Sequence, residues 1–100
     1  MIRMEPVQLE KGTAWAVEVK LPKTTLISIS TDIGYIMCGA LDIKLLNEKL
    51  QDRKIIAGRA VGVRTIEQLL DSPLESVTIE AKARGIEAGM TGREALQKML

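Results

Sequence analysis

The stretch GYIMCGALD at residues 34–42 and its echo GRAVGVRT at residues 58–65 decide the predicted fold. Each contains a short apolar run with glycine at its end, followed by a residue suited to begin a helix, Asp42 in the first and Thr65 in the second. This pattern is typical of a strand that leads into a helix. Two strands joined by a helix crossover run parallel, so we expect the two stretches to be neighbours in one sheet.

The residues between the two stretches predict the connecting helix. Ile43, Leu46 and Leu50 recur at spacings of three and four, which predicts a helix of about three turns from Asp42 to Gln51. Strands are predicted over residues 35–38 and 55–63. In the second strand Gly58, Ala60 and Gly62 share one face, so we expect either backbone or a ligand to approach that face closely.

Residues 1–31 predict an antiparallel meander, because apolar and polar residues alternate along them. Keeping Leu9 on one face with Trp15 and Val17 predicts a three-residue connection that ends at Gly12. A bend at residues 22–24 and a third strand over 25–31 follow. The face that carries Trp15 needs a cover, which either the chain's own helices or a partner subunit can supply.

Residues 65–100 predict helices. Three segments place a hydroxyl residue three positions before Glu or Gln, as a capping box requires: Thr65 to Gln68, Ser72 to Glu75 and Thr91 to Glu94. The middle helix is predicted to begin at Ser72 and to stop at Gly85. We therefore predict a single domain over residues 1–100 of mixed α+β and α/β class. It comprises the meander, a strand-helix-strand unit over 34–64 and three short helices packed on the sheet.

Composition excludes several classes of function. The 100 residues are 46% hydrophobic and 27% charged, which is typical of globular proteins, and they lack the long apolar run of a membrane span. A net charge of +1 without a basic stripe argues against nucleic-acid binding. With no histidine and one cysteine, we predict neither a metal site nor a cofactor. The lone cysteine and the absence of a secretory signal favour the cytoplasm.

The predicted strand pair yields a candidate ligand site. Carboxyl ends of parallel strands meet at one sheet edge, where helix N-termini and arginines favour a phosphate or carboxylate. The glycines let a ligand approach the main chain. The predicted ligand-binding residues are Cys38, Gly39, Asp42, Arg59, Gly62, Arg64 and Thr65.

Each of these residues also has a structural interpretation. Cys38 is either a thiolate nucleophile or a small buried side chain, and Asp42 is either an acid–base group or a helix cap. Arg59 and Arg64 either contact a ligand or pair with carboxylates such as Glu67. Three hypotheses follow: a module that binds a small anionic metabolite, an enzyme that uses Cys38 with Asp42, and a structural protein with a macromolecular partner.

Three segments carry a resemblance to a known family: GYIMCGALDIKLLN at 34–47, DRKIIAGRAVGVRTIEQLLDSPLESVT at 52–78 and GMTGREAL at 89–96. They resemble the YunC-like proteins, a bacterial and archaeal family of unknown function, over nearly the whole chain. The resemblance implies that the N-terminal strands assemble a homotetramer, which agrees with a position of Trp15 near an interface. It implies no catalytic residues.

Overall fold

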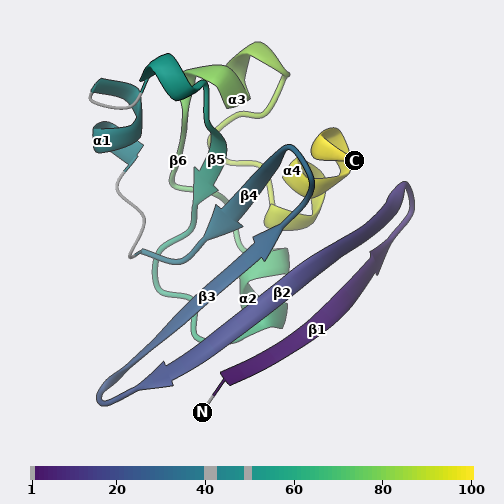
Figure 1. Ribbon diagram of the computed structural model, residues 1–100, viewed down its shortest axis with the longest axis vertical. Helices are drawn as coiled ribbons and strands as arrows, with labels where there is room; N and C mark the ends of the chain where they lie inside the picture. Colours follow the sequence, from purple (N-terminus) through teal and green to yellow (C-terminus); the bar gives the residue numbers. More distant parts are fainter. Residues whose placement is uncertain (1, 40–42, 49–50) are drawn as a thin grey trace.

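The computed structural model describes residues 2–39, 43–48 and 51–100. Within them, six strands form one sheet whose spatial order equals their order in the sequence (Figure 1). The strands are β1 (Ile2–Leu9), β2 (Gly12–Leu21), β3 (Thr24–Ser30), β4 (Gly34–Met37), β5 (Ile56–Arg59) and β6 (Ser76–Val77). The α-helices are α1 (Ile43–Glu48), α2 (Ile66–Asp71), α3 (Ile79–Ala83) and α4 (Gly92–Met99), and a 3-10 turn, η1, spans Gln51–Arg53.

The central prediction, a parallel pair of adjacent strands, is confirmed. All neighbours in the sheet are antiparallel except β4 and β5, which are parallel, with Gly34 opposite Ile56 and Met37 opposite Arg59. β5 ends earlier than predicted. Gly62, at a φ of 75°, turns the chain away from the sheet after β5. The carboxyl ends of β4 and β5 therefore lie side by side, as expected.

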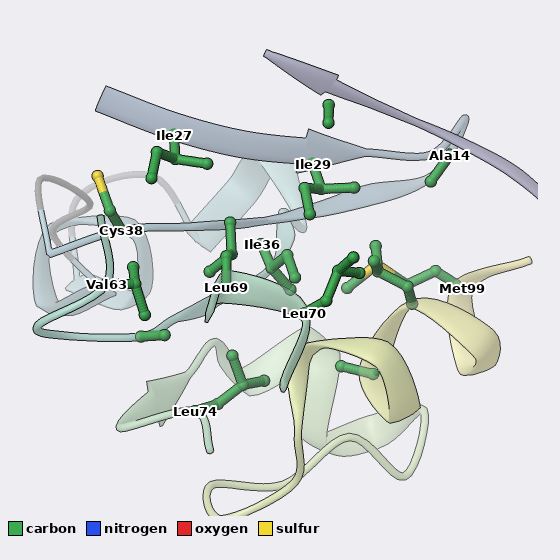
Figure 2. Close-up of a cluster of buried hydrophobic side chains, with 14 of the residues drawn as sticks. Ala14, Ile27, Ile29, Ile36, Cys38, Val63, Leu69, Leu70, Leu74 and Met99 are labelled. Atoms are coloured by element: carbon green, nitrogen blue, oxygen red, sulfur yellow. The ribbon is translucent and has the colours of Figure 1, made fainter. Parts of the chain in front are cut away.

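The core lies between one face of the sheet, called the inner face here, and helices α2 and α4 (Figure 2). Ile29 and Ile36 from the sheet are fully buried with Leu69 and Leu96 from the helices. Gly58 also lies on the inner face, and a Cβ added there would lie 2.7 Å from Leu74 Cδ1. The close approach predicted from the glycines is thus made by a side chain of the same molecule.

The predicted three-residue hairpin turn is wrong. Leu9 pairs with Gly12, so two residues connect β1 to β2, and Pro6 rather than Val7 pairs with Trp15. Ala14 and Ala16 face the helices, because their small side chains let the helices approach the sheet closely. Trp15 consequently lies on the opposite, outer face.

The helix caps are partly as predicted. Thr65 caps α2 and Thr91 caps α4, and the helix before Gly85 ends there with Gly85 at a φ of 83°. The predicted helix start at Ser72 is wrong: Ser72 ends α2, and Thr78 begins α3. Residues 72–77 are instead extended, because their backbone bonds to residues 89–92 and to β5 outcompete a local helix. Among the helices of the described segments, none has the length and apolar character needed to cross a bilayer.

Candidate functional site

The structure divides the predicted site residues between the two faces of the sheet. Successive side chains of a strand point to opposite faces. Ala57 packs on α1 at the outer face, and Arg59, two residues later, points to the same side and lines a cleft beside α1 and β6. Arg64 lines a different cleft, next to the β2–β3 turn. Arg59 and Arg64 therefore do not share one crevice.

Cys38 occupies a structural position. Its side chain is buried in the main core, where Figure 2 shows it with Ile27 and Val63. The thiol Sγ lies 3.9 Å from the carbonyl oxygen of Thr25, to which it donates a weak hydrogen bond. This geometry supports the small-buried-residue interpretation. Its predicted acid–base companion, Asp42, lies outside the described residues.

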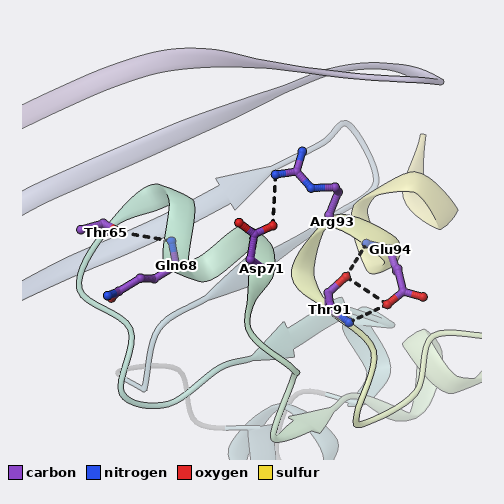
Figure 3. Close-up of polar contacts among 6 residues, drawn as sticks. All are labelled: Thr65, Gln68, Asp71, Thr91, Arg93 and Glu94. Carbon is purple, nitrogen blue, oxygen red and sulfur yellow. Dashed lines mark hydrogen bonds and ion pairs between the residues drawn. The ribbon is translucent and has the colours of Figure 1, made fainter.

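Thr65 positions the loop that carries Arg64. Its hydroxyl oxygen accepts a hydrogen bond from the backbone N–H of Gln68 at 3.0 Å (Figure 3). The Gln68 side chain in turn accepts a bond from the backbone N–H of Arg64 at 2.7 Å. Thr65 and Gln68 together fix the start of α2. Thr65 is thus a capping residue whose hydroxyl is already engaged.

The outer cleft around Arg59 has balanced charges. Arg59 Nη1 lies 3.4 Å from Glu75 Oε1, and Lys82 and Glu48 line the same cleft of ≈ 500 Å³. Gly39 lies close by, because a Cβ added to it would be 3.8 Å from Arg59 Nη2. These contacts favour the ion-pair interpretation for Arg59.

A second cleft of ≈ 500 Å³ lies at the carboxyl edge of the parallel pair, and we call it the basic cleft. One wall is the end of the β2–β3 hairpin, and the other is the loop over residues 62–64. The lining residues are Lys20, Leu21, Lys23, Thr24, Thr25, Gly62, Val63 and Arg64. Three of these side chains are cationic, and none of the lining residues is acidic.

Among the described residues, no carboxylate forms an ion pair with a cation of the basic cleft. The ion pairs within the described part of the chain are Arg3–Glu5, Arg59–Glu75 and Arg93–Asp71, the last shown in Figure 3. None of them includes Lys20, Lys23 or Arg64. A cleft with unneutralised positive charge can take an anion, and Arg64 supplies a planar group suited to phosphate or carboxylate oxygens.

Reasoning from the sequence identified Gly62 and Arg64 but missed Lys20, Lys23 and the adjacent threonines. No motif links them, since the hairpin precedes Arg64 by about forty positions. The antiparallel pairing of β3 with β4, which sets Ser28 opposite Met37, carries the hairpin end to this edge. The pairing of β2 with β3, β3 with β4 and β4 with β5 is the signal that finds them.

Residues 37–99 match the protein family described as "Domain of unknown function (DUF1805)". The chain belongs to this family. Over 100 residues it is 61% identical to "Uncharacterized protein YunC" of Bacillus subtilis (strain 168), a match that covers 100% of this chain and 99% of that protein. Membership in DUF1805 confirms the resemblance seen in the sequence.

A solved structure shares the fold. It is the crystal structure of a protein of unknown function, TA1206, from Thermoplasma acidophilum, with a TM-score of 0.89 and 25% sequence identity. The match covers 100% of this chain and 94% of that one. Within this DUF1805 chain, the Arg64 wall of the basic cleft falls inside the matched segment, and the Lys20–Lys23 wall precedes it.

Proposed function

We propose that the protein binds a small anionic metabolite in the basic cleft, at the carboxyl edge of β4 and β5. The observation that supports this most is the set of three cations, Lys20, Lys23 and Arg64, which share one cleft without a carboxylate partner among the described residues. Its volume of ≈ 500 Å³ falls within the range of about 300–1,000 Å³ typical of small-molecule sites.

The loop opposite the hairpin is built to present Arg64. Gly62 turns the chain, and no atom lies within 4 Å of a Cβ added there, so the main chain at this point is open to a ligand. Val63 packs into the core and anchors the loop. Arg64 is held through its backbone by Gln68, which leaves the guanidinium exposed.

A thermal-shift screen tests this proposal with phosphorylated and carboxylated metabolites. A ligand present at 100 times its Kd stabilises a folded protein by about 2.7 kcal/mol, which raises the melting temperature by roughly 10–20 °C for a chain of this size. We expect a stabilising metabolite for the wild type and loss of that shift in Arg64→Gln. Lys98→Gln, a charge change on α4 outside the cleft, is the matched control. No stabilising anion for the wild type would refute the proposal.

We also propose that the protein self-associates in the cytoplasm through the outer face of β1–β3. In these strands every residue on this face is uncharged, whereas the inner face carries charged residues such as Arg3 and Glu18. The outer-face residues are Ile2, Met4, Pro6, Gln8, Thr13, Trp15, Val17, Val19, Leu21, Thr24, Leu26, Ser28 and Ser30.

The second copy of this chain is the partner that this face fits best. The exposed fractions of Ile2, Met4 and Trp15 are 72%, 66% and 49%, so the apolar surface is wide and uncovered. Two uncharged faces meet without like-charge repulsion, as a self-complementary interface of two-fold symmetry requires. This two-fold contact joins two copies. A homotetramer requires in addition that each copy contacts a further copy, either through another part of the same face or through a second interface.

Sedimentation velocity and the fluorescence of the single tryptophan test self-association. We expect an oligomer whose Trp15 emission shifts to the red on dilution, and a monomer for Trp15→Lys. Ile79→Lys, at an apolar side chain that is 57% exposed on α3, is the matched control and stays oligomeric. A monomeric wild type at every concentration would refute this part of the proposal.

Two other functions have less support. A thiol enzyme needs Cys38 accessible, and the core buries it. A structural role with a different macromolecular partner would use the same outer face, and a pull-down that recovers only this chain would count against it.

A further inference from the structure

Both walls of the basic cleft carry positive charge. Lys20 and Lys23 come from the β2–β3 hairpin, and Arg64 comes from the facing loop. A ligand with one negative charge would compensate one wall and leave the repulsion among the remaining cations in place. A ligand with two or more negative charges compensates both walls together.

We infer that the occupant of the basic cleft carries a phosphoryl dianion or a diphosphate, and is not a simple carboxylate. This inference rests on the proposed anion binding and specifies its ligand class. A phosphate monoester carries a charge of about −1.5 to −2 near neutral pH and offers three acceptor oxygens. Those oxygens match a bidentate guanidinium at Arg64 and point charges at Lys20 and Lys23.

The hydroxyl-bearing residues of the hairpin add to this match. Thr24 and Thr25 line the cleft beside the lysines. A hydroxyl donates one hydrogen bond, so these residues can engage acceptor oxygens that the cations leave free. Leu21 and Val63 supply an apolar part of the lining against which the uncharged body of a phosphate ester can rest. The cleft thus combines features that suit a small phosphorylated organic molecule.

The backbone at Lys23 allows the charge of this residue to be tested separately from its place in the turn. Lys23 has a φ of 65°, in the left-handed region where glycine and asparagine are preferred and lysine is uncommon. It occupies the second position of the two-residue turn between Leu21 and Thr24, where Pro22 comes first, as in a type II turn. A turn selected for stability alone would favour glycine here.

Isothermal titration with acetate, inorganic phosphate and pyrophosphate at constant ionic strength tests the inference. For the wild type, we expect affinity to rise in the order acetate, phosphate, pyrophosphate, with at least roughly a tenfold gap between the first and the last, because charge-assisted bonds multiply with anion charge. The proteins titrated are the wild type, Lys23→Asn, Arg64→Gln and the control Lys98→Gln.

The variant Lys23→Asn separates a binding role from a structural one. Asparagine suits the left-handed backbone better than lysine, so we expect a melting temperature equal to or above that of the wild type, together with roughly tenfold weaker binding of pyrophosphate. The control should bind as the wild type does. Unchanged pyrophosphate affinity in Lys23→Asn would overturn the inference.

The failure of this inference is distinct from the failure of the proposed function. Equal affinity for acetate and pyrophosphate, lost for both in Arg64→Gln, would overturn the phosphoryl preference and leave anion binding intact. Absence of saturable binding for all three anions, with no hit in the metabolite screen, would overturn both.

Discussion

At the scale of single residues, Gly58 shows how tightly the inner face is packed. A Cβ added there would lie 2.7 Å from Leu74 Cδ1 and 3.5 Å from Val77 Cγ1. Leu74 is itself buried, so its end has little room to move. We expect Gly58→Ala to destabilise the protein by about 1–3 kcal/mol.

Urea unfolding checks this prediction against a matched substitution. In Gly39→Ala the new Cβ meets Val61 Cγ1 at 3.7 Å, an ordinary van der Waals distance, so its unfolding midpoint should stay near that of the wild type. Equal midpoints for the two variants would show that the close approach at Gly58 does not constrain the fold.

Cys38 gives a second prediction at this scale. Because its thiol is buried among core side chains, a thiol reagent such as iodoacetamide should modify it slowly in the folded protein and rapidly in denaturing urea. Mass spectrometry of the alkylated chain over time follows the reaction. A rate in the folded state as fast as that of the unfolded chain would contradict the burial and restore the enzyme hypothesis.

At the scale of secondary-structure elements, Thr78 joins β5 to α3. Its side chain is buried, and its hydroxyl oxygen accepts bonds from the backbone N–H of Ala57 at 3.1 Å and of Ala81 at 3.2 Å. Thr78→Val would leave both donors without this acceptor, at a cost of about 1–3 kcal/mol for each group that stays unsatisfied. Thr78→Ser keeps the oxygen and is the control. Chemical denaturation distinguishes them, and equal stability of the two variants would contradict the dual role.

The capping box of α4 makes the stability of this helix depend on pH. Hydrogen bonds from the backbone N–H and hydroxyl of Thr91 to the Glu94 carboxylate lower the pKa of Glu94 below its ordinary value of 4.5 (Figure 3). A carboxyl group whose pKa is lower in the folded state stabilises that state above pH 4.5. This contribution is lost as the pH falls through the lowered folded-state pKa.

The variant Glu94→Ala tests this dependence. Because α4 buries Ala95, Leu96 and Met99 in the core, the loss of the Glu94 carboxylate from its capping box should lower the stability of the whole protein near neutral pH. The difference in urea midpoint from the wild type should shrink in acid below the pKa of Glu94. A difference that stays constant from neutral pH into this acid range would contradict the prediction.

The predicted elements that held are those with local causes. Thr65 and Thr91 begin helices because the bonds they make lie within one turn. The apolar run before Gly39 forms β4 over Gly34–Met37, and Cys38 lies just beyond its end. Ser72 carries the same local signal and fails. Leu74 donates to the carbonyl of Met90, and Glu75 donates to that of Arg59, so bonds to distant residues hold this segment extended.

At the scale of the whole molecule, the parallel strand pair could be predicted from the sequence. Which side chains of the β1–β2 hairpin face the helices could not. The parallel pair is determined by an apolar run, a segment with helical periodicity and a second apolar run. In β2, the more hydrophobic of the two alternating sets of side chains contains Trp15, Val17 and Val19, so hydrophobicity alone predicts that this set faces the core. The inner face takes Ala14 and Ala16 instead, because helices α2 and α4 come close to it.

The candidate site was predictable only in part, because some of its residues are brought together by long-range strand pairing. Arg64 lies in the loop that leaves β5, five positions after Arg59, so its place near the carboxyl edge follows from the strand pair. Lys20 and Lys23 reach that edge through two further antiparallel pairings, which fix where the β2–β3 turn ends. Cys38, Arg59 and Thr65 each have a hydrogen-bond partner within the protein, namely Thr25, Glu75 and Gln68, and the strand pattern does not reveal the first two.

The most direct test of the central claim, anion binding at the carboxyl edge of the parallel pair, is a pyrophosphate titration followed by amide NMR shifts of the ¹⁵N-labelled full chain. Saturable shifts should be confined to the walls of the basic cleft, at residues 20, 21, 23–25 and 62–64, with α4 unchanged. Saturable shifts around Arg59 and Lys82 in the outer cleft, or no saturable shifts at all, would contradict the account.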